Sequence, residues 1–289
     1  LLLERSTWIH MSVSVREAAR RVASAGTRPL MDDADALTAL HLARTAAASE
    51  AHRHVDADGS PETVARELLE AQVSVLLPAL APSAAIVPLR IPVQVPERDY
   101  EVVVGRDLLD LLAEEVSRIG FGPIALLTDW SVGPLFEPAI RARLQAAGRS
   151  VVTVTLPEGE VNKEIAPVLD AVDRLLNVGW QRGSPVVALG GGVVGDMAGL
   201  VASLLLRGVP LVQVPTTLLA MVDSAVGGKV GVNHRRGKNL IGHFHQPALV
   251  VSDLRFLDTL PDRELRAGLA EVVKTALLGD VELFATLER

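Results

Sequence analysis

From residue 100 onward, short apolar runs alternate with longer segments whose apolar residues recur at helical spacing. The apolar runs predict buried strands at residues 100–104, 124–128, 151–156 and 186–189. Between them, residues 108–116 and 165–176 have the pattern of amphipathic helices. Strands that alternate with helices form mostly parallel sheets with helices on both faces. We therefore expect an α/β domain of this kind.

The first ninety residues carry weaker signals. Residues 8–11 form an apolar, strand-like run, which Arg- and Ala-rich helical patterns follow. A turn at 58–61 precedes a predicted helix at 64–69. Residues 71–90 are rich in Ala, Pro, Ser and Val, which is typical of a connection between domains. The expected parts are a first segment at 1–70, this linker at 71–90, an α/β domain at 91–262 and the start of a helical domain at 263–289.

The composition narrows the class of protein. Of the 289 residues, 49% are hydrophobic and 3% aromatic, which suits buried parallel strands. The formal net charge of −7 argues against nucleic acid as a partner. There is no cysteine, so any metal must be held by His, Asp or Glu. No apolar run reaches the roughly 18 residues that cross a bilayer, and we expect a cytoplasmic enzyme with no membrane partner.

Both ends of the chain suggest a piece of a longer protein. The sequence begins with Leu1 rather than Met, and it stops at Arg289 directly after a helix-like stretch that has no capping signal. We therefore expect truncation at both ends.

A glycine-rich segment directly follows the strand predicted at 186–189. Gly190, Gly192 and Gly195 satisfy the pattern G-x-G-x-x-G and precede an apolar, helix-like run, as in dinucleotide-binding loops. Taken alone, the pattern is also typical of structural turns. Two features of the Rossmann fingerprint are missing, because the loop lies about 90 residues into its domain and no acid follows about 20 residues later. An ordinary Rossmann dehydrogenase is therefore not favoured.

Polar residues that suit a nucleotide and a phosphorylated substrate lie on both sides of the glycines. The loop 157–163 holds two carboxylates, a glycine and a lysine, which can bind ribose hydroxyls and neutralise phosphate. Downstream, a glycine-rich segment threaded by Val, Leu and Ile contains Arg207, Thr216, Thr217, Asp223, Lys229, Asn233, His234, Lys238 and Asn239. Because solvated loops are seldom so rich in aliphatic residues, we interpret the segment as part of a site.

A helix-like segment near the end of the chain carries a second polar group. Glu271 and Lys274 are three residues apart and therefore share a helix face. Such a pair is often a surface ion pair. Its apolar neighbours favour a pair that points into a site.

Four segments carry a specific resemblance to a known family. They are GGGVVGDMAG, RGVPLVQVPTTLLAMVDSAVGGK, NHRRGKNLIG and LPDRELRAGLAEVVK. Together they resemble the 3-dehydroquinate synthase family, the sugar-phosphate cyclases of the shikimate pathway, over roughly residues 91–289. The resemblance implies a Rossmann-like NAD-binding domain and the start of a C-terminal helical domain. The glycines would cradle the pyrophosphate of NAD.

The resemblance also implies a role for each matching residue. The implied NAD contacts are Asp129, Glu158, Glu160, Lys163, Gly191, Gly192, Gly195, Asp196, Thr216, Thr217, Lys229, Lys238, Phe256 and Thr259. The implied substrate and catalytic contacts are Arg207, Asp223, Lys229, Asn239 and Lys274. Glu271 would be one of three ligands of a catalytic divalent metal, zinc or cobalt.

Enzymes of this family use bound NAD transiently. They convert 3-deoxy-arabino-heptulosonate 7-phosphate, a seven-carbon keto acid phosphate, into 3-dehydroquinate. One hydroxyl is oxidised, phosphate leaves by elimination, the hydride returns, the ring opens and an aldol step closes the product. The residue types fit, because a metal acidifies the oxygen being oxidised, Arg207 suits a phosphate and lysines stabilise an enolate. We expect a sugar-phosphate substrate and a homodimer for the complete protein.

The chain departs from the family at the metal site. The other two family ligands are histidines of a C-terminal helical domain, and the chain ends before that domain. His234, His243 and His245 lie in the site region but occupy neither ligand position, and we interpret His243 and His245 as wall residues. We expect the chain to bind NAD but to turn over little substrate.

The first seventy residues resemble the last part of shikimate kinase. Arg21 and Arg28 match arginines of the lid that covers ATP, and Arg44 matches the arginine that binds the shikimate carboxylate. The family's Pro and Tyr after that arginine are Ala46 and Ala48 here, and a generic helical segment is the alternative. No G-x-x-x-x-G-K-[ST] loop occurs in the chain. The order of the two segments indicates a fused, bifunctional protein of the shikimate pathway.

Other functions stay open beside this one. A related cyclase of secondary metabolism would act on another sugar phosphate. A metal-dependent polyol dehydrogenase would share the fold and the NAD site but release NADH. A fragment that binds the nucleotide without catalysis is a further alternative.

Overall fold

The computed structural model describes residues 9–12, 53–56, 87–96 and 98–288. The chain divides into two compact units, one made of Leu1–Pro82 with Val273–Arg289 and the other of Ser83–Val272. In the first unit, β1 (Ile9–Ser12) pairs in parallel with β2 (Arg53–Asp56). This confirms the strand expected from the apolar run at 8–11.

Several expectations for the first segment lie outside the described residues. They are the turn at 58–61, the helix at 64–69, most of the linker at 71–90, and Arg21, Arg28 and Arg44, on which the kinase resemblance rests. Near the end of the chain, α8 (Asp262–Gly279) and α9 (Val281–Leu287) follow each other, so the helix expected around Glu271 is confirmed.

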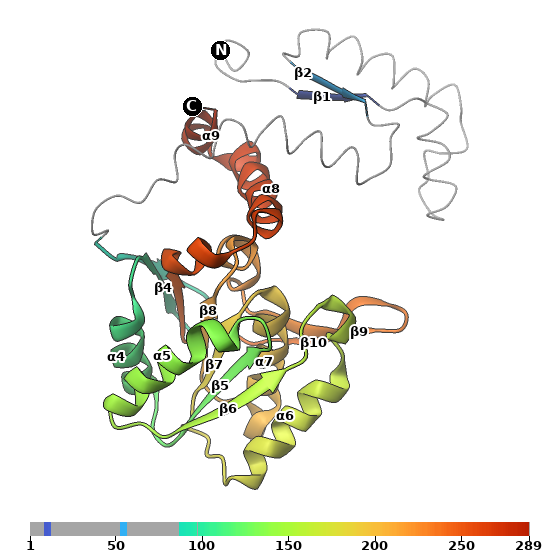
Figure 1. Ribbon diagram of the computed structural model, residues 1–289. Helices are drawn as coiled ribbons and strands as arrows, with labels where there is room; N and C mark the ends of the chain where they lie inside the picture. The colour runs from blue at the N-terminus through green and yellow to red at the C-terminus, as the bar shows by residue number, and fades with distance from the viewer. Residues whose placement is uncertain (1–8, 13–52, 57–86, 97, 289) are drawn as a thin grey trace. The chain divides into compact units, whose positions relative to one another are not determined.

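The second unit is built on a seven-stranded sheet with the strand order β3, β4, β11, β8, β7, β5, β6. Figure 1 labels β4, β5, β6, β7 and β8 of this sheet. The strands are β3 (Leu89–Val93), β4 (Tyr100–Gly105), β5 (Ile124–Asp129), β6 (Val151–Leu156), β7 (Val186–Gly190), β8 (Leu211–Pro215) and β11 (Leu249–Asp253). β3 pairs antiparallel with β4, whereas the other printed pairs of this sheet are parallel. The expected mostly parallel sheet is therefore confirmed.

Four helices cover the two faces of the sheet (Figure 1). They are α4 (Leu109–Ile119), α5 (Gly133–Ala146), α6 (Ile165–Asn177) and α7 (Gly192–Leu204). Along β5, Ile124 and Leu126 pack in one core with α4 and α5, while Ala125 and Leu127 pack in another with α6 and α7. Because successive strand residues point to opposite faces, a strand buried on both sides reads as a continuous apolar run.

A hairpin lies outside the main sheet. β9 (Lys229–His234) and β10 (Gly237–Phe244) pair antiparallel, and Val230 and Val232 of β9 join the core formed by α6 and α7. At Gly199 of α7 an added Cβ would lie 2.2 Å from Val230 Cγ1, so the glycine lets the hairpin approach the helix closely. Within the described part of the chain, no helix is long and apolar enough to span a membrane.

Candidate active site

The candidate site lies where the helices change sides of the sheet. β5 and β7 are parallel neighbours, but α5, which follows β5, packs on one face and α7, which follows β7, packs on the other. In open α/β sheets such a change leaves a crevice at the carboxyl ends of the two strands, where ligands bind. Asp129 ends β5 and Gly190 ends β7, so both residues lie at this crevice.

The glycine loop leaves little room for side chains. A Cβ added at Gly190 would lie 2.6 Å from the Val194 Cβ, and one added at Gly192 would lie 3.0 Å from Ser224 Oγ. Helix α7 begins directly after the loop, and no side-chain hydrogen bond caps its first turn. Free backbone N–H groups at a helix N-terminus bind phosphate. The arrangement has the geometry of a phosphate cradle.

Thr216 and Thr217 follow β8 and lie against this loop. The Thr216 backbone N–H donates to the Gly190 carbonyl oxygen over 3.0 Å, and a Cβ at Gly191 would lie 3.1 Å from Thr217 Cγ2. The buried Thr216 hydroxyl has no hydrogen-bond partner among the described residues. Because buried polar atoms are normally paired, this hydroxyl is a candidate ligand contact.

Asp129 and Glu158 lie on the other side of the crevice. The Asp129 carboxylate accepts hydrogen bonds from the backbone N–H groups of Ser131, over 3.0 Å, and Val132, over 2.7 Å. The Ser131 hydroxyl donates to the exposed carboxylate of Glu158. Both carboxylates therefore border the crevice, and each has oxygen atoms that can accept bonds from ribose hydroxyls.

Lys163 joins three separate elements. Its side chain is buried, and its ammonium donates to the Asp196 carboxylate of α7 and, over 2.6 Å, to Asn239 Oδ1 of β10. Burial raises the pKa of Asp196, and the ion pair with Lys163 opposes this without cancelling it. The expected NAD contacts Lys163 and Asp196 and the expected substrate contact Asn239 thus form one cluster.

Glu160 lies beside this cluster. Its carboxylate accepts a hydrogen bond from Asn233 Nδ2 over 2.9 Å and lies 3.6 Å from the Lys238 ammonium. Burial alone would raise the pKa of Glu160, but the bond from Asn233 and the charges of Lys163 and Lys238 outweigh it and lower the pKa. Glu160 is therefore a carboxylate at neutral pH.

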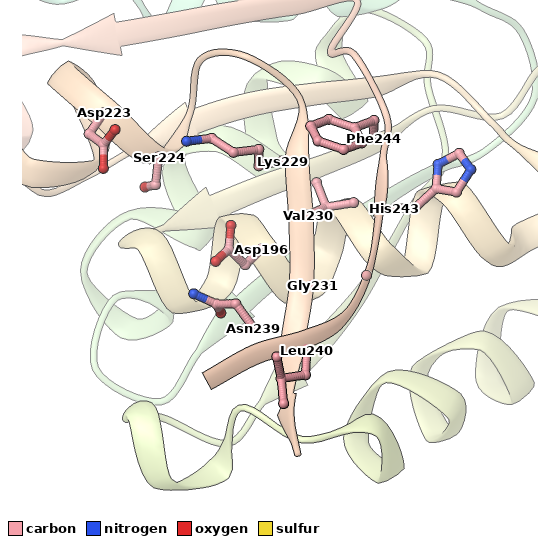
Figure 2. Close-up of a pocket in the computed structure, with 11 residues that line it drawn as sticks. Asp196, Asp223, Ser224, Lys229, Val230, Gly231, Asn239, Leu240, His243 and Phe244 are labelled. Atoms are coloured by element: carbon pink, nitrogen blue, oxygen red, sulfur yellow. The ribbon is translucent and has the colours of Figure 1, made fainter. Parts of the chain in front are cut away.

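A cavity of about 430 Å³ adjoins the cluster, a size that suits a small molecule. It is lined by Asp196, by Asp223 and Ser224 of η5 (Ala220–Ser224), and by Lys229, Val230, Gly231, Asn239, Leu240, Gly242, His243 and Phe244 of the hairpin. Figure 2 shows the Lys229 side chain reaching toward Ser224 and Asp223, with Asp196 close to Asn239. The structure thus brings together the expected residues Asp196, Asp223, Lys229 and Asn239.

Sequence reasoning did not select some residues that line this cavity. Ser224 directly follows Asp223 and packs on Gly192, while Leu240 and the exposed Phe244 form part of the wall. Ser224 could have been selected from the sequence, because it lies in the same glycine-rich segment as Asp223 and Lys229. An exposed phenylalanine on a strand has no such sequence signal, because its exposure is known only from the fold.

Arg207 is not brought to the cavity of its own chain. It lies in η4 (Leu205–Arg207), beyond the end of α7, and the 13 residues of that helix span about 20 Å. Arg207 is exposed, has a φ of +69° and does not line the cavity. Its expected contact with substrate stays a prediction.

Phe256 and Thr259 also lie away from the cavity lining. Phe256 is buried in the core, with its ring centroid 4.7 Å from that of Phe136. The Thr259 hydroxyl donates to the Phe256 carbonyl oxygen over 3.2 Å. Their expected NAD contacts stay predictions.

Helix α8 packs closely on the loop after β8. A Cβ at Gly268 would lie 2.6 Å from both Leu218 Cβ and Leu219 N. Further along α8, Glu271 is half-buried and Lys274 is exposed. No cluster of three His, Cys, Asp or Glu that could hold a metal occurs among the described residues. The metal ligand role of Glu271 and the substrate role of Lys274 stay predictions.

The three histidines of the region differ in their surroundings. His243 lines the cavity, as expected of a wall residue, whereas His245 does not. A ring nitrogen of His245 lies 2.9 Å from the Val209 carbonyl oxygen, and burial lowers the pKa of this histidine. His234 is exposed at the end of β9, where its Nδ1 accepts a hydrogen bond from the Arg236 N–H over 3.3 Å.

Residues 153–267 match the family described as 3-dehydroquinate synthase N-terminal. A 3-dehydroquinate synthase of Caulobacter vibrioides is 50% identical over 201 residues, which are 68% of this chain and 54% of that protein. Over these residues the chain is similar to 3-dehydroquinate synthases. The chain spans about half the length of this 3-dehydroquinate synthase.

Two solved structures of related cyclases extend this similarity to the fold. The 2-epi-5-epi-valiolone synthase of Streptomyces hygroscopicus, with NAD⁺ and Zn²⁺ bound, matches with a TM-score of 0.60 and 36% identity over 67% of this chain and 53% of that chain. A 2-deoxy-scyllo-inosose synthase complexed with carbaglucose-6-phosphate, NAD⁺ and Co²⁺ matches with a TM-score of 0.62 and 30% identity over 65% of this chain and 52% of that chain. The α/β, Rossmann-like fold of the 3-dehydroquinate synthase type is thus supported.

Proposed function

We propose that this chain supplies the NAD-binding part of a 3-dehydroquinate synthase, which converts 3-deoxy-arabino-heptulosonate 7-phosphate to 3-dehydroquinate and phosphate. The observation that carries the proposal is the glycine cradle at the switch point, which opens beside a polar cavity. The 50% identity to a 3-dehydroquinate synthase favours this substrate over those of the two related cyclases, which are 30% and 36% identical.

The residues present fit NAD. Gly190 leaves no room for a Cβ and Gly191 and Gly192 leave little, while the uncapped first turn of α7 offers N–H groups to the pyrophosphate. The Thr216 hydroxyl supplies an unused polar atom beside them. Asp129 and Glu158 would bind ribose hydroxyls. When bound, NAD would accept and return a hydride.

The cavity provides the groups that a phosphorylated keto acid requires. Lys229 places a cation in it, and Asn239 adds an amide. Lysines stabilise the negative charge of the enolate that forms when the proton next to the ketone is removed, and this charge is consumed when phosphate leaves. Asp223 adds a carboxylate that can accept a proton from a substrate hydroxyl within hydrogen-bond reach. The residues of the hairpin therefore bind and orient the substrate while those of the glycine loop hold the nucleotide.

The divalent metal is proposed on a narrower basis. Glu271 is the one residue that the family resemblance assigns as a ligand, and the described residues contain no set of three candidate ligands. The described residues alone do not make the site. Zinc or cobalt stays part of the proposal because the two related cyclases were crystallised with Zn²⁺ or Co²⁺.

The rest of the proposal concerns the natural protein as a whole. We propose that residues 1–70 derive from a shikimate kinase fused to the synthase, that the protein is cytoplasmic, and that it acts as a homodimer. The basis for the fusion is the sequence resemblance at Arg21, Arg28 and Arg44. An assay of ATP-dependent phosphorylation of shikimate by the purified natural protein would test the fusion. Absence of this activity would contradict it.

One assay separates the synthase from the alternative functions. The natural protein receives 3-deoxy-arabino-heptulosonate 7-phosphate in large excess over NAD, and released phosphate is measured together with absorbance of reduced nicotinamide. We expect phosphate to exceed the NAD supplied while the NADH trace stays flat, because the hydride returns to the same substrate. Accumulating NADH would favour a polyol dehydrogenase. Turnover of another sugar phosphate in place of this one would favour a related cyclase.

A further inference from the structure

The β9–β10 hairpin is irregular at one point. Gly237 pairs with His234, and the next pair is Ile241 with Val232. Residues 238–240 of β10 therefore stand opposite a single residue of β9, which is Asn233. Bulges of this kind re-aim side chains next to functional sites. The bulged residues include Lys238 and Asn239, both expected in the site.

The hydrogen bonds of Asn233 replace the missing ladder. Its backbone N–H donates to the Lys163 carbonyl oxygen over 2.8 Å. Its side-chain NH₂ donates to the Glu160 carboxylate over 2.9 Å and to the Glu160 carbonyl oxygen over 3.3 Å. Its Oδ1 accepts the backbone N–H of Asn239 over 2.9 Å. One side chain thus joins the loop before α6 to the bulge of β10.

This contact holds Asn239 in an uncommon conformation. Asn239 has a φ of +55°, in the left-handed region that residues other than glycine seldom occupy. The bond from its N–H to Asn233 Oδ1 stabilises that backbone. In this conformation the Asn239 side chain meets the Lys163 ammonium, with Oδ1 and Nζ 2.6 Å apart. Asn233 therefore determines how Asn239 stands relative to Lys163.

The geometry points to Asn233 as a positioning residue that couples the nucleotide side of the site to the substrate side. Asn233 does not line the cavity, but it fixes Glu160 and Lys163 on one side and Asn239 on the other. The identity of the ligands rests on the proposed function. The positioning itself rests on hydrogen bonds of the chain.

An exchange of charge and donor between two residues tests this role. Asn233→Asp removes the NH₂ donor and places a carboxylate against the Glu160 carboxylate. In Glu160→Gln with Asn233→Asp, an amide can again donate to a carboxylate, and the acceptor for the Asn239 N–H is kept. A direct contact shows itself as non-additivity in such a cycle.

Calorimetry with NAD gives the first readout. We expect N233D to weaken NAD binding about tenfold in the native background but less than about twofold in the E160Q background. Asn177→Asp is the matched control, because Asn177 is exposed at the end of α6 that points away from the loop. N177D should leave the affinity unchanged. Equal losses from N233D in both backgrounds would overturn the inference.

Hydrogen exchange gives a readout that needs no ligand. Amide exchange in residues 235–242 should become faster in N233D than in the native chain and N177D, and it should slow again in the double variant. If the native chain fails to bind NAD, the proposed function fails while this arm still tests Asn233. If N233D alone does not fold, the inference requires that the double variant E160Q/N233D folds and that its amides in residues 235–242 are protected from exchange. A double variant that stays unfolded while E160Q folds would refute the coupling.

Discussion

The Lys163 ammonium nitrogen lies 2.6 Å from the side-chain oxygen of Asn239, although 76 positions separate the two residues in sequence. The same ammonium pairs with Asp196, which lies on α7 four residues after Gly192. A single buried cation thus connects the loop before α6, the helix after the glycines and the hairpin. The consequences of removing it can be measured.

Lys163→Met should destabilise the chain in a pH-dependent way. Removing one partner of a buried ion pair costs about 3 kcal/mol, because the other charge stays buried without it. Burial already raises the pKa of Asp196 above its ordinary 3.8. The folded state therefore binds that proton more tightly than the unfolded state, and stability falls as pH rises through the folded pKa. The loss in K163M should be largest at neutral pH and smaller below about pH 4.

Denaturant unfolding of K163M at both pH values measures this difference. The double variant K163M with Asp196→Asn should recover most of the stability at neutral pH, because no buried carboxylate is left unpaired. Equal losses at neutral and acidic pH would show that Lys163 acts through packing rather than through its charge.

Gly190→Ala should destabilise the fold and weaken NAD binding. The new Cβ would lie 2.6 Å from both Cβ and Cγ2 of Val194, a β-branched residue in the first turn of α7 that has little rotamer freedom. Overpacking of this kind costs about 1 to 3 kcal/mol. In denaturant unfolding, the double variant Gly190→Ala with Val194→Ala should recover part of the free energy of unfolding that Gly190→Ala loses. At Gly279 nothing lies within 4 Å of an added Cβ, so Gly279→Ala is the control that should change stability little.

Gly268→Ala should separate α8 from the loop after β8. The added Cβ would meet Leu219 N and Leu218 Cβ at 2.6 Å, and the backbone nitrogen cannot rotate away. We expect a loss of about 1 to 3 kcal/mol in the free energy of unfolding. Amide exchange in residues 216–224 should become faster. Unchanged exchange there would mean that the loop after β8 does not depend on its contact with α8.

Arg207→Ala should leave NAD binding by this chain within about twofold of the native affinity, as for a site distant from the mutation. Arg207 lies beyond the end of α7, whereas the glycine loop lies at its start. Calorimetry with NAD measures this directly. A loss of more than about tenfold would mean that Arg207 supports the nucleotide site.

Strands β5 and β7 were predictable because they are buried on both faces, whereas the equally buried β8 and β11 were not expected. Residues 124–127 and 186–189 are continuously apolar, and the strands expected at 124–128 and 186–189 have nearly the expected length. Helix α5 was not expected, since Pro138 lies inside it and a proline in a helix interior is unfavourable. The hairpin was interpreted only as a site-bearing segment, because one of its faces packs on a helix rather than on a strand.

The candidate site was predictable where its chemistry is local in sequence. The strand, glycines and helix from Val186 to Leu204 are contiguous, so their pattern predicts the cradle. The bond between Lys163 and Asn239 depends on the bulge at residues 238–240, which no hydrophobic pattern encodes. The absence of Arg207 from the cavity lining was also not predictable from the sequence, because it depends on the direction in which α7 leaves the glycine loop.

Calorimetric titration of the native chain with NAD, alongside Gly192→Val, tests the central claim most directly. A side chain at residue 192 would meet Ser224 Oγ at 3.0 Å and fill the cradle. We predict one saturable NAD site in the native chain and at least about hundredfold weaker binding in G192V, measured at a temperature at which both proteins are folded. Absence of saturable binding by the native chain, or equal affinities in both, would contradict the assignment of this loop to NAD.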